Sequence, residues 1–195
     1  MAAVNEEYRR LYMELYDLLD RAYMDRYMLE ELLNFREVVI QQTHEIKTRA
    51  DYVLRHTFHV LKEDLCLTLW KVYFDTDKRA HTIKKMPHYL IKTAQKRCDS
   101  KLSKEMAAYE SVIDTIRKQG LAHNDKDKSE AFVELHVLFQ ILDEIRSLFA
   151  DMYDRSIDST VFQMDDNHLR ALKHYCSEGL KLMLYRDDQP IVIRQ

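Results

Sequence analysis

The sharpest polar break between two apolar-periodic runs in the C-terminal half of this chain reads Arg117-Lys118-Gln119-Gly120-Leu121-Ala122-His123-Asn124-Asp125-Lys126-Asp127-Lys128. It holds one of only two glycines in 195 residues, and the chain has only two prolines. Strands joined by tight turns need many more such residues, so their scarcity favours long helices. Gly120 suits the left-handed conformation that often ends a helix. Asp127 and Glu130 have the spacing of a capping box, which predicts that a new helix begins there.

Apolar residues recur at helical spacing on both sides of this break. Two long runs cover residues 5–33 and 36–74, a shorter one begins at Thr82, and a fourth begins at Ser103 and ends at Gly120. After the break, one run extends to residue 152, and a last one begins at Asp165 or Asp166. The apolar positions of the first of these include Leu138, Leu142, Ile145 and Phe149, and those of the last include Leu169, Tyr175, Leu180 and Met183. We therefore predict an all-α, single-domain bundle of about five to six helices over residues 1–185. Residues 186–195 are predicted to be a C-terminal tail outside the core.

Bulk composition narrows the class of protein. Hydrophobic residues make up 46% and charged residues 32%, which is typical of a soluble globular chain. The net charge of −3 gives no overall attraction to nucleic acid or to a membrane. No apolar run approaches the ~18 residues of a membrane helix, and the N-terminus lacks a secretory signal pattern. Three scattered cysteines favour free thiols in a reducing cytosol, so we expect a cytoplasmic protein. We also expect no membrane association, no metal and no cofactor.

A basic segment lies upstream of the break. Residues 78–104 contain nine Lys or Arg residues against one acid, Asp99. Such a segment is often a solvated helix face, and it can instead be a surface that follows the phosphates of RNA. On the second interpretation, the RNA-binding side chains are Lys84, Lys85, Lys92, Lys96 and Arg97, with Lys118 and Lys126 from the break itself.

Two further patterns have a functional and a structural interpretation. Five of the twelve tyrosines follow the first predicted helix, where they could stack on bases, although a core or dimer surface is favoured. They are Tyr8, Tyr12, Tyr16, Tyr23 and Tyr27. His56, His59 and Glu63 share one helix face and could hold a metal ion, although surface histidines are common.

Arg117 and His123 are the candidate catalytic pair. A neutral histidine can remove the proton from a ribose 2′-hydroxyl, and an arginine can hold the adjacent phosphate through two hydrogen bonds. Attack of that 2′-oxygen on the phosphate cleaves RNA without a metal and spares DNA. The spacing alone is weak evidence, because Arg49 and His56 satisfy the same loose rule within a predicted continuous helix.

The run Ala122-His123-Asn124-Asp125, with Arg117 before it and lysines after it, resembles the signature loop of the HEPN superfamily (higher eukaryotes and prokaryotes nucleotide-binding). It looks like the branch named for abortive infection, type U. Residues 65–77, LCLTLWKVYFDTD, resemble the helix of that branch that ends in an aromatic-Asp pair before a short helix. The resemblance covers roughly residues 30–150. One departure is Lys118, where the superfamily usually has a small polar or acidic residue.

The resemblance implies a helical bundle that forms a homodimer through the helices flanking residues 117–128. It implies a metal-independent endoribonuclease, a toxin or phage-defence effector with an antitoxin protein as a partner. Arg117 would bind the phosphate and His123 would be the general base or acid, paired across the dimer. Asn124 and Asp125 would orient His123 or, like Asp127, cap the next helix. The alternative is a non-catalytic helical module that binds nucleotide, RNA or a protein.

Overall fold

The computed structural model describes residues 2–43, 49–75, 82–89, 107, 109–111, 114, 134–151, 164–186 and 189–190. Its elements, in chain order, are α1 (Ala2–Thr43), α2 (Arg49–Leu69), the π-helical turn η1 (Trp70–Phe74), the 3₁₀ helix η2 (Ile83–Tyr89), α5 (Leu135–Asp151), α6 (Asp166–Leu184), and the short strands β1 (Tyr185–Arg186) and β2 (Gln189–Pro190). Apart from that two-residue antiparallel strand pair, every described element is helical, which confirms the all-α prediction for this part of the chain. None of the described helices is long and apolar enough to cross a membrane.

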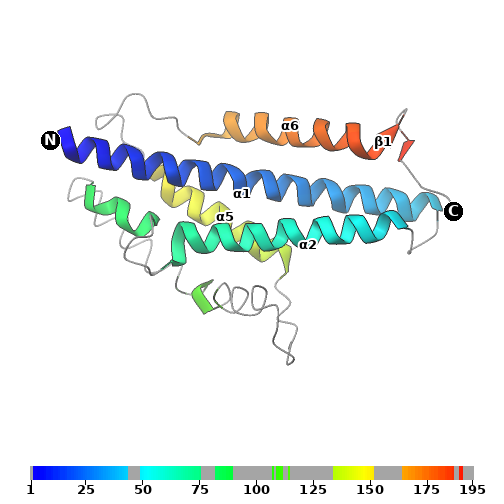
Figure 1. Cartoon of the computed structure of the whole chain (residues 1–195), viewed down its shortest axis with the longest axis horizontal. Helices are drawn as coiled ribbons and strands as arrows, with labels where there is room; N and C mark the ends of the chain where they lie inside the picture. Colours follow the sequence, from blue (N-terminus) through cyan, green and yellow to red (C-terminus); the bar gives the residue numbers. More distant parts are fainter. Residues whose placement is uncertain are drawn as a thin grey trace.

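Helix α1 is the axis of the bundle. Its 42 residues extend about 60 Å at 1.5 Å per residue, and α2, α5 and α6 all pack against it (Figure 1). Figure 1 shows that α2 runs antiparallel to α1, whereas α6 runs parallel to it. The contacts of α6 agree with this direction, because His168 meets Asp20 near one end and Tyr185 meets Phe35 near the other. Three helices that differ in direction thus share one central helix.

The tyrosines of α1 belong mainly to the core. Tyr8, Tyr12 and Tyr23 are almost completely inaccessible, Tyr27 is buried, and Tyr16 is half-buried. The ring of Tyr12 stacks on Phe149 of α5, with 4.5 Å between the centroids. A fully buried ring cannot stack on a nucleobase, so the structural interpretation of this stripe is confirmed for its buried members.

The first helix continues past the predicted break between residues 33 and 36, and that boundary was wrong. Asn34 is only a mild helix breaker, whereas Leu32, Phe35 and Val39 keep a buried stripe through the region. The Phe35 ring meets Tyr185 edge-on at 5.3 Å, so the chain that follows α6 holds this part of α1 in the bundle. The predicted tail therefore begins with a strand pair, in which Arg186 pairs with Gln189 and β2 contacts α1.

Helices α5 and α6 agree with the sequence pattern to different degrees. In α5 the predicted positions Leu138, Leu142, Ile145 and Phe149 are all completely buried. In α6, the predicted apolar positions Leu169 and Leu180 are buried, but Tyr175 and Met183, which were predicted as apolar positions of the same helix, are 73% exposed. Among the described helices α6 packs mainly against α1, so only part of its apolar stripe is covered.

Asp165 caps α6, as the sequence predicts. Its side chain accepts a hydrogen bond of 2.8 Å from the backbone N–H of His168, while its own backbone is extended. Replacing Asp165 with alanine should lower the free energy of unfolding by about 1 kcal/mol, because a backbone donor in the first turn loses its partner. Urea denaturation followed by circular dichroism would measure the change. Asp165→Asn should retain most of the stability, and an equal loss in both variants would contradict the capping role.

Candidate functional site

Most of the predicted ribonuclease site lies outside the described residues. This applies to Arg117 and His123, and to Lys92, Lys96, Arg97, Lys118, Asn124, Asp125, Lys126 and Asp127. Of the predicted RNA-binding side chains, the structure places only Lys84 and Lys85, both in η2. The described helices on either side of the break therefore give the setting of the site rather than its geometry.

The residues on either side of segment 115–133 pack against the same core. Before them, the described residues 107, 109–111 and 114 are helical, and Tyr109 packs against the core cluster. After them, α5 begins at Leu135, which packs against that cluster as well. The two elements that flank the predicted loop are thus anchored to one bundle.

Lys84 connects the first of these flanking elements to an aromatic corner, which consists of Tyr73 and Phe74 of η1. Its Nζ forms an ion pair of 2.8 Å with Glu110 and lies 4.4 Å from the ring centroid of Tyr73. Burial, and after it the charge of Glu110, raises the pKa of Tyr73, so its hydroxyl stays protonated. The positive charge of Lys84 is therefore already matched by a carboxylate within the chain, and its contact with RNA remains a prediction.

The corner depends on a π-helical turn that no sequence signal indicated. At the end of α2, the backbone N–H of Asp75 donates to the carbonyl of Trp70, five residues earlier, at 2.9 Å. The wider turn buries Val72, Tyr73 and Phe74 in succession. The helix ends at the Phe74-Asp75 pair, as predicted, and π-helical turns occur often at functional sites. Here the turn presents two aromatic rings to Lys84.

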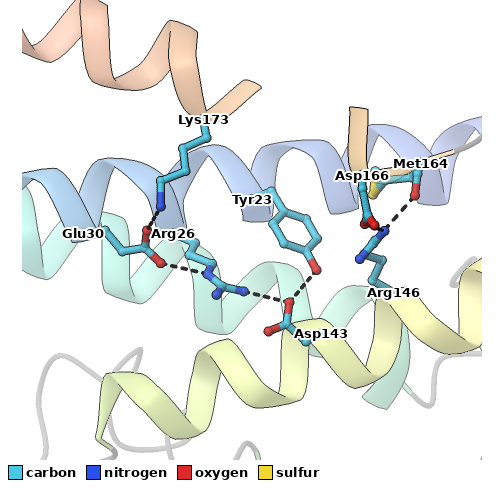
Figure 2. Close-up of polar contacts among 8 residues, drawn as sticks. All are labelled: Tyr23, Arg26, Glu30, Asp143, Arg146, Met164, Asp166 and Lys173. Atoms are coloured by element: carbon cyan, nitrogen blue, oxygen red, sulfur yellow. Dashed lines mark hydrogen bonds and ion pairs between the residues drawn. The ribbon is translucent and has the colours of Figure 1, made fainter. Parts of the chain in front are cut away.

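A second polar cluster joins α1, α5 and α6 on another side of the bundle (Figure 2). Asp143 of α5 accepts hydrogen bonds from the Tyr23 hydroxyl at 2.8 Å and from Arg26 Nη1 at 2.7 Å. Arg26 Nε also donates to Glu30 at 3.0 Å, and Lys173 of α6 donates to the other oxygen of Glu30 at 3.0 Å. The Arg26 guanidinium lies 5.0 Å from the ring centroid of Phe139. Neighbouring Arg146 binds Asp166 and the carbonyl of Met164.

This cluster borders an open groove of about 550 Å³ that includes Arg26, Phe139 and Asp143. Burial and the hydrogen bond to Asp143 raise the pKa of Tyr23, so the phenol is a donor and not a base at neutral pH. Arg26 has carboxylates on two of its edges and an aromatic ring on a face. Because these groups satisfy one another, the arrangement is suited to joining helices rather than to proton transfer.

Asp143→Ala should lower the free energy of unfolding by about 1–3 kcal/mol, because the Tyr23 hydroxyl and the Arg26 guanidinium both lose an acceptor. Chemical denaturation at constant pH would measure the loss. Glu144→Ala, which removes the neighbouring carboxylate on α5, is the matched control and should change stability by less than about 0.5 kcal/mol. Equal losses in the two variants would show that the cluster does not hold the helices together.

A titratable cluster also joins the start of α6 to α1. His168 Nε2 lies 2.6 Å from Asp20 Oδ1 and 3.3 Å from the Tyr16 hydroxyl. Burial, followed by the charges of Asp20, Asp165 and Asp17, raises the pKa of Tyr16. His168 Nε2 is already bound to the Asp20 carboxylate, so this cluster connects α6 to α1.

The described residues give no support to the metal interpretation of α2. Within the part of the chain that it describes, no group of three or more His, Cys, Asp or Glu side chains could hold a metal ion, and His56, His59 and Glu63 are all in that part. Spacing on one helix face brings side chains near one another but does not make them converge. The two described cysteines are free thiols, as predicted, and burial raises the pKa of Cys66 to about 12.

Comparisons with protein-family models, with curated proteins and with solved structures found no match to this chain.

Proposed function

We propose that this protein is a metal-independent endoribonuclease of the HEPN type that acts as a homodimer, in the role of a toxin or phage-defence effector. The observation that carries the proposal is the polar, glycine-containing stretch at 117–128, which combines Arg117 with the run Ala122-His123-Asn124-Asp125. An arginine and a histidine are the two groups that cleavage by a 2′-hydroxyl needs when no metal is used.

Two features of the described helices support it. The elements before and after residues 115–133 both pack on the core cluster, through Tyr109 and Leu135, so a loop between them would have fixed ends. The aromatic corner at Phe74-Asp75 adjoins the first of these elements through the Lys84–Glu110 ion pair. A catalytic loop needs rigid support, because small displacements of the reacting groups greatly slow catalysis.

In the proposed reaction, His123 removes the proton from a ribose 2′-hydroxyl, and the 2′-oxygen attacks the adjacent phosphorus. The bond from phosphorus to the 5′-oxygen breaks, and the histidine of the second copy protonates that oxygen. Arg117 binds the phosphate and stabilises the negative charge that builds on its oxygens. The products are a 2′,3′-cyclic phosphate and a free 5′-hydroxyl.

The test is incubation of the purified protein with total cellular RNA in excess EDTA, with the products resolved on a gel and their ends identified. We expect RNA fragments with 2′,3′-cyclic phosphate ends, and no cleavage of DNA, which lacks the 2′-hydroxyl. Salt-sensitive RNA binding without any product, or cleavage that requires added Mg²⁺, would overturn the proposed activity.

A further inference from the structure

One long side of α1 faces away from α5. Figure 1 shows α6, α1 and α2 next to one another, with α5 crossing on one side of α1. Tyr23 and Arg26 bind Asp143 of α5, so they mark the covered side of α1. Residues two apart in an α-helix point about 200° apart, so Arg21 lies opposite Tyr23. The residues that repeat with Arg21 at steps of four and three are Asp17, Met24, Met28 and Glu31. Asp17, Arg21 and Met24 are exposed, so this open stripe lies on the surface.

Helix α2 contributes an apolar edge to the same face. Val53 and Val60 precede Asp64 by eleven and four residues, so the three share one stripe of α2. Asp64 faces Asp25 of α1, and Asp25 follows Arg21 by four residues. Val53 and Val60, 67% and 48% exposed, therefore border the open stripe.

Helix α6 contributes the other edge. The charges of Asp20, Asp25 and Glu31 all act on the Cys176 thiol, so Cys176 lies toward the open stripe, whereas Lys173 turns the other way to Glu30. Met183 follows Cys176 by seven residues and shares its stripe. The adjacent stripe of α6, farther from Lys173, carries Tyr175 and Leu182. The space next to Gly179 is open, because a Cβ atom at this position would have no neighbour within 4 Å. Leu182 is 84% exposed.

The exposed apolar side chains are concentrated on this face. Seven large hydrophobic side chains are exposed among the described residues, and six of them lie on the open stripe or its two edges. The exception is Leu33, which follows Arg26 by seven residues and so lies on the α5 side of α1. A concentration of this kind marks a protein interaction site, whereas single exposed apolar residues are ordinary.

The polar groups between the two edges are mainly acidic. Between residues 17 and 31 the open stripe carries Asp17 and Glu31 against one base, Arg21, and Asp64 borders it. From α6, the charge of Lys181 also reaches Glu31. Asp25 is only 6% exposed, and its Oδ2 atom has no hydrogen-bond partner in the described part of the chain. An acidic floor disfavours RNA and anionic membranes and favours a cationic occupant.

We propose that this face, formed by α6, α1 and α2, binds an amphipathic helix of a partner protein whose polar side is basic. The apolar side of that helix packs between Val60 on one edge and Leu182 on the other. The Lys or Arg residues that border its apolar side pair with Asp17, Glu31 and Asp64. Binding of this type lays an apolar helix face into a groove, and the charges select the partner. The proposal does not depend on the ribonuclease activity.

The test uses the full chain and a fluorescein-labelled amphipathic helical peptide about five turns long, with leucines on one side and lysines on the other. A matched peptide carries glutamate in place of every lysine. Fluorescence anisotropy should show that the lysine peptide binds at least about tenfold more tightly than the glutamate peptide. The double variant Leu182→Ser/Met183→Ser should weaken binding of the lysine peptide by about tenfold or more, because two exposed apolar contacts are lost.

Leu33→Ser is the matched control, since it removes an exposed leucine from the α5 side of α1, and it should leave binding unchanged. Asp17→Lys/Glu31→Lys should reverse the preference between the two peptides. Equal affinity for both peptides, or the same loss in Leu33→Ser as in Leu182→Ser/Met183→Ser, would overturn the proposal. So would sedimentation data in which the wild-type chain dimerises and Leu182→Ser/Met183→Ser is monomeric, because the occupant would then be a second copy.

Discussion

His123→Ala should reduce the rate of RNA cleavage in EDTA by about 100-fold or more, and Arg117→Ala should reduce it by a similar factor. General acid–base catalysis contributes roughly 10²–10⁴-fold, and loss of one charged group that stabilises the transition state costs roughly 10²–10³-fold. Initial rates on one RNA substrate, measured at fixed salt, would give both factors. Gel filtration should show that both variants retain the wild-type oligomeric state, which separates loss of chemistry from loss of assembly.

The chain contains its own matched control for this experiment. Arg49 and His56 follow the same order as Arg117 and His123 with similar spacing, but both lie within the continuous helix α2. His56 is exposed, so His56→Ala should leave the fold intact. Arg49→Ala and His56→Ala should therefore cleave RNA at the wild-type rate. If His123→Ala also does so, the assignment of the site is wrong even if the protein is a ribonuclease.

The parts of the fold that the sequence predicted well are those where one helix face is completely covered. In α5, a strict spacing of leucine, isoleucine and phenylalanine matches a completely buried stripe. Asp165 was predictable as a cap because the helix start needs a side-chain acceptor whatever the tertiary structure is. Local requirements of this kind can be read directly from the order of residues.

The features that sequence analysis missed depend on contacts between distant residues. Phe35 keeps α1 helical beyond the predicted break, and its partner, Tyr185, is 150 positions away. Tyr175 and Met183 fit an apolar stripe, but their exposure depends on how many helices surround α6. Lys84 was assigned to RNA from local charge, and its partner Glu110 is visible only once the chain is folded. Arg117 and His123 lie outside the described residues, so their roles stay a prediction from the sequence.

Asp25→Asn should raise the free energy of unfolding at pH 8 by on the order of 2–4 kcal/mol and should change it little at pH 4. Burial, and then the charge of Asp64 across the α1–α2 contact, raises the pKa of Asp25 to about 7, although Arg21 acts in the opposite direction. Below pH 4 the carboxyl is protonated in both the folded and the unfolded chain, so it carries no penalty. Between pH 4 and 7 the folded chain holds a proton that the unfolded chain releases, so wild-type stability falls as the pH rises.

Urea denaturation at pH values from 4 to 8.5 would measure this difference, with Asp17→Asn as the matched control on an exposed position of the same helix. We expect the curves of wild type and Asp17→Asn to stay parallel. The curve of Asp25→Asn should separate from them as the pH rises from about 4 to 7, and the difference should be constant above that range. Asparagine is neutral at every pH, so the variant removes the cost of burying a charge next to Asp64 while it keeps a polar group of similar size. A constant difference between Asp25→Asn and wild type over the whole range would mean that Asp25 does not gain a proton on folding.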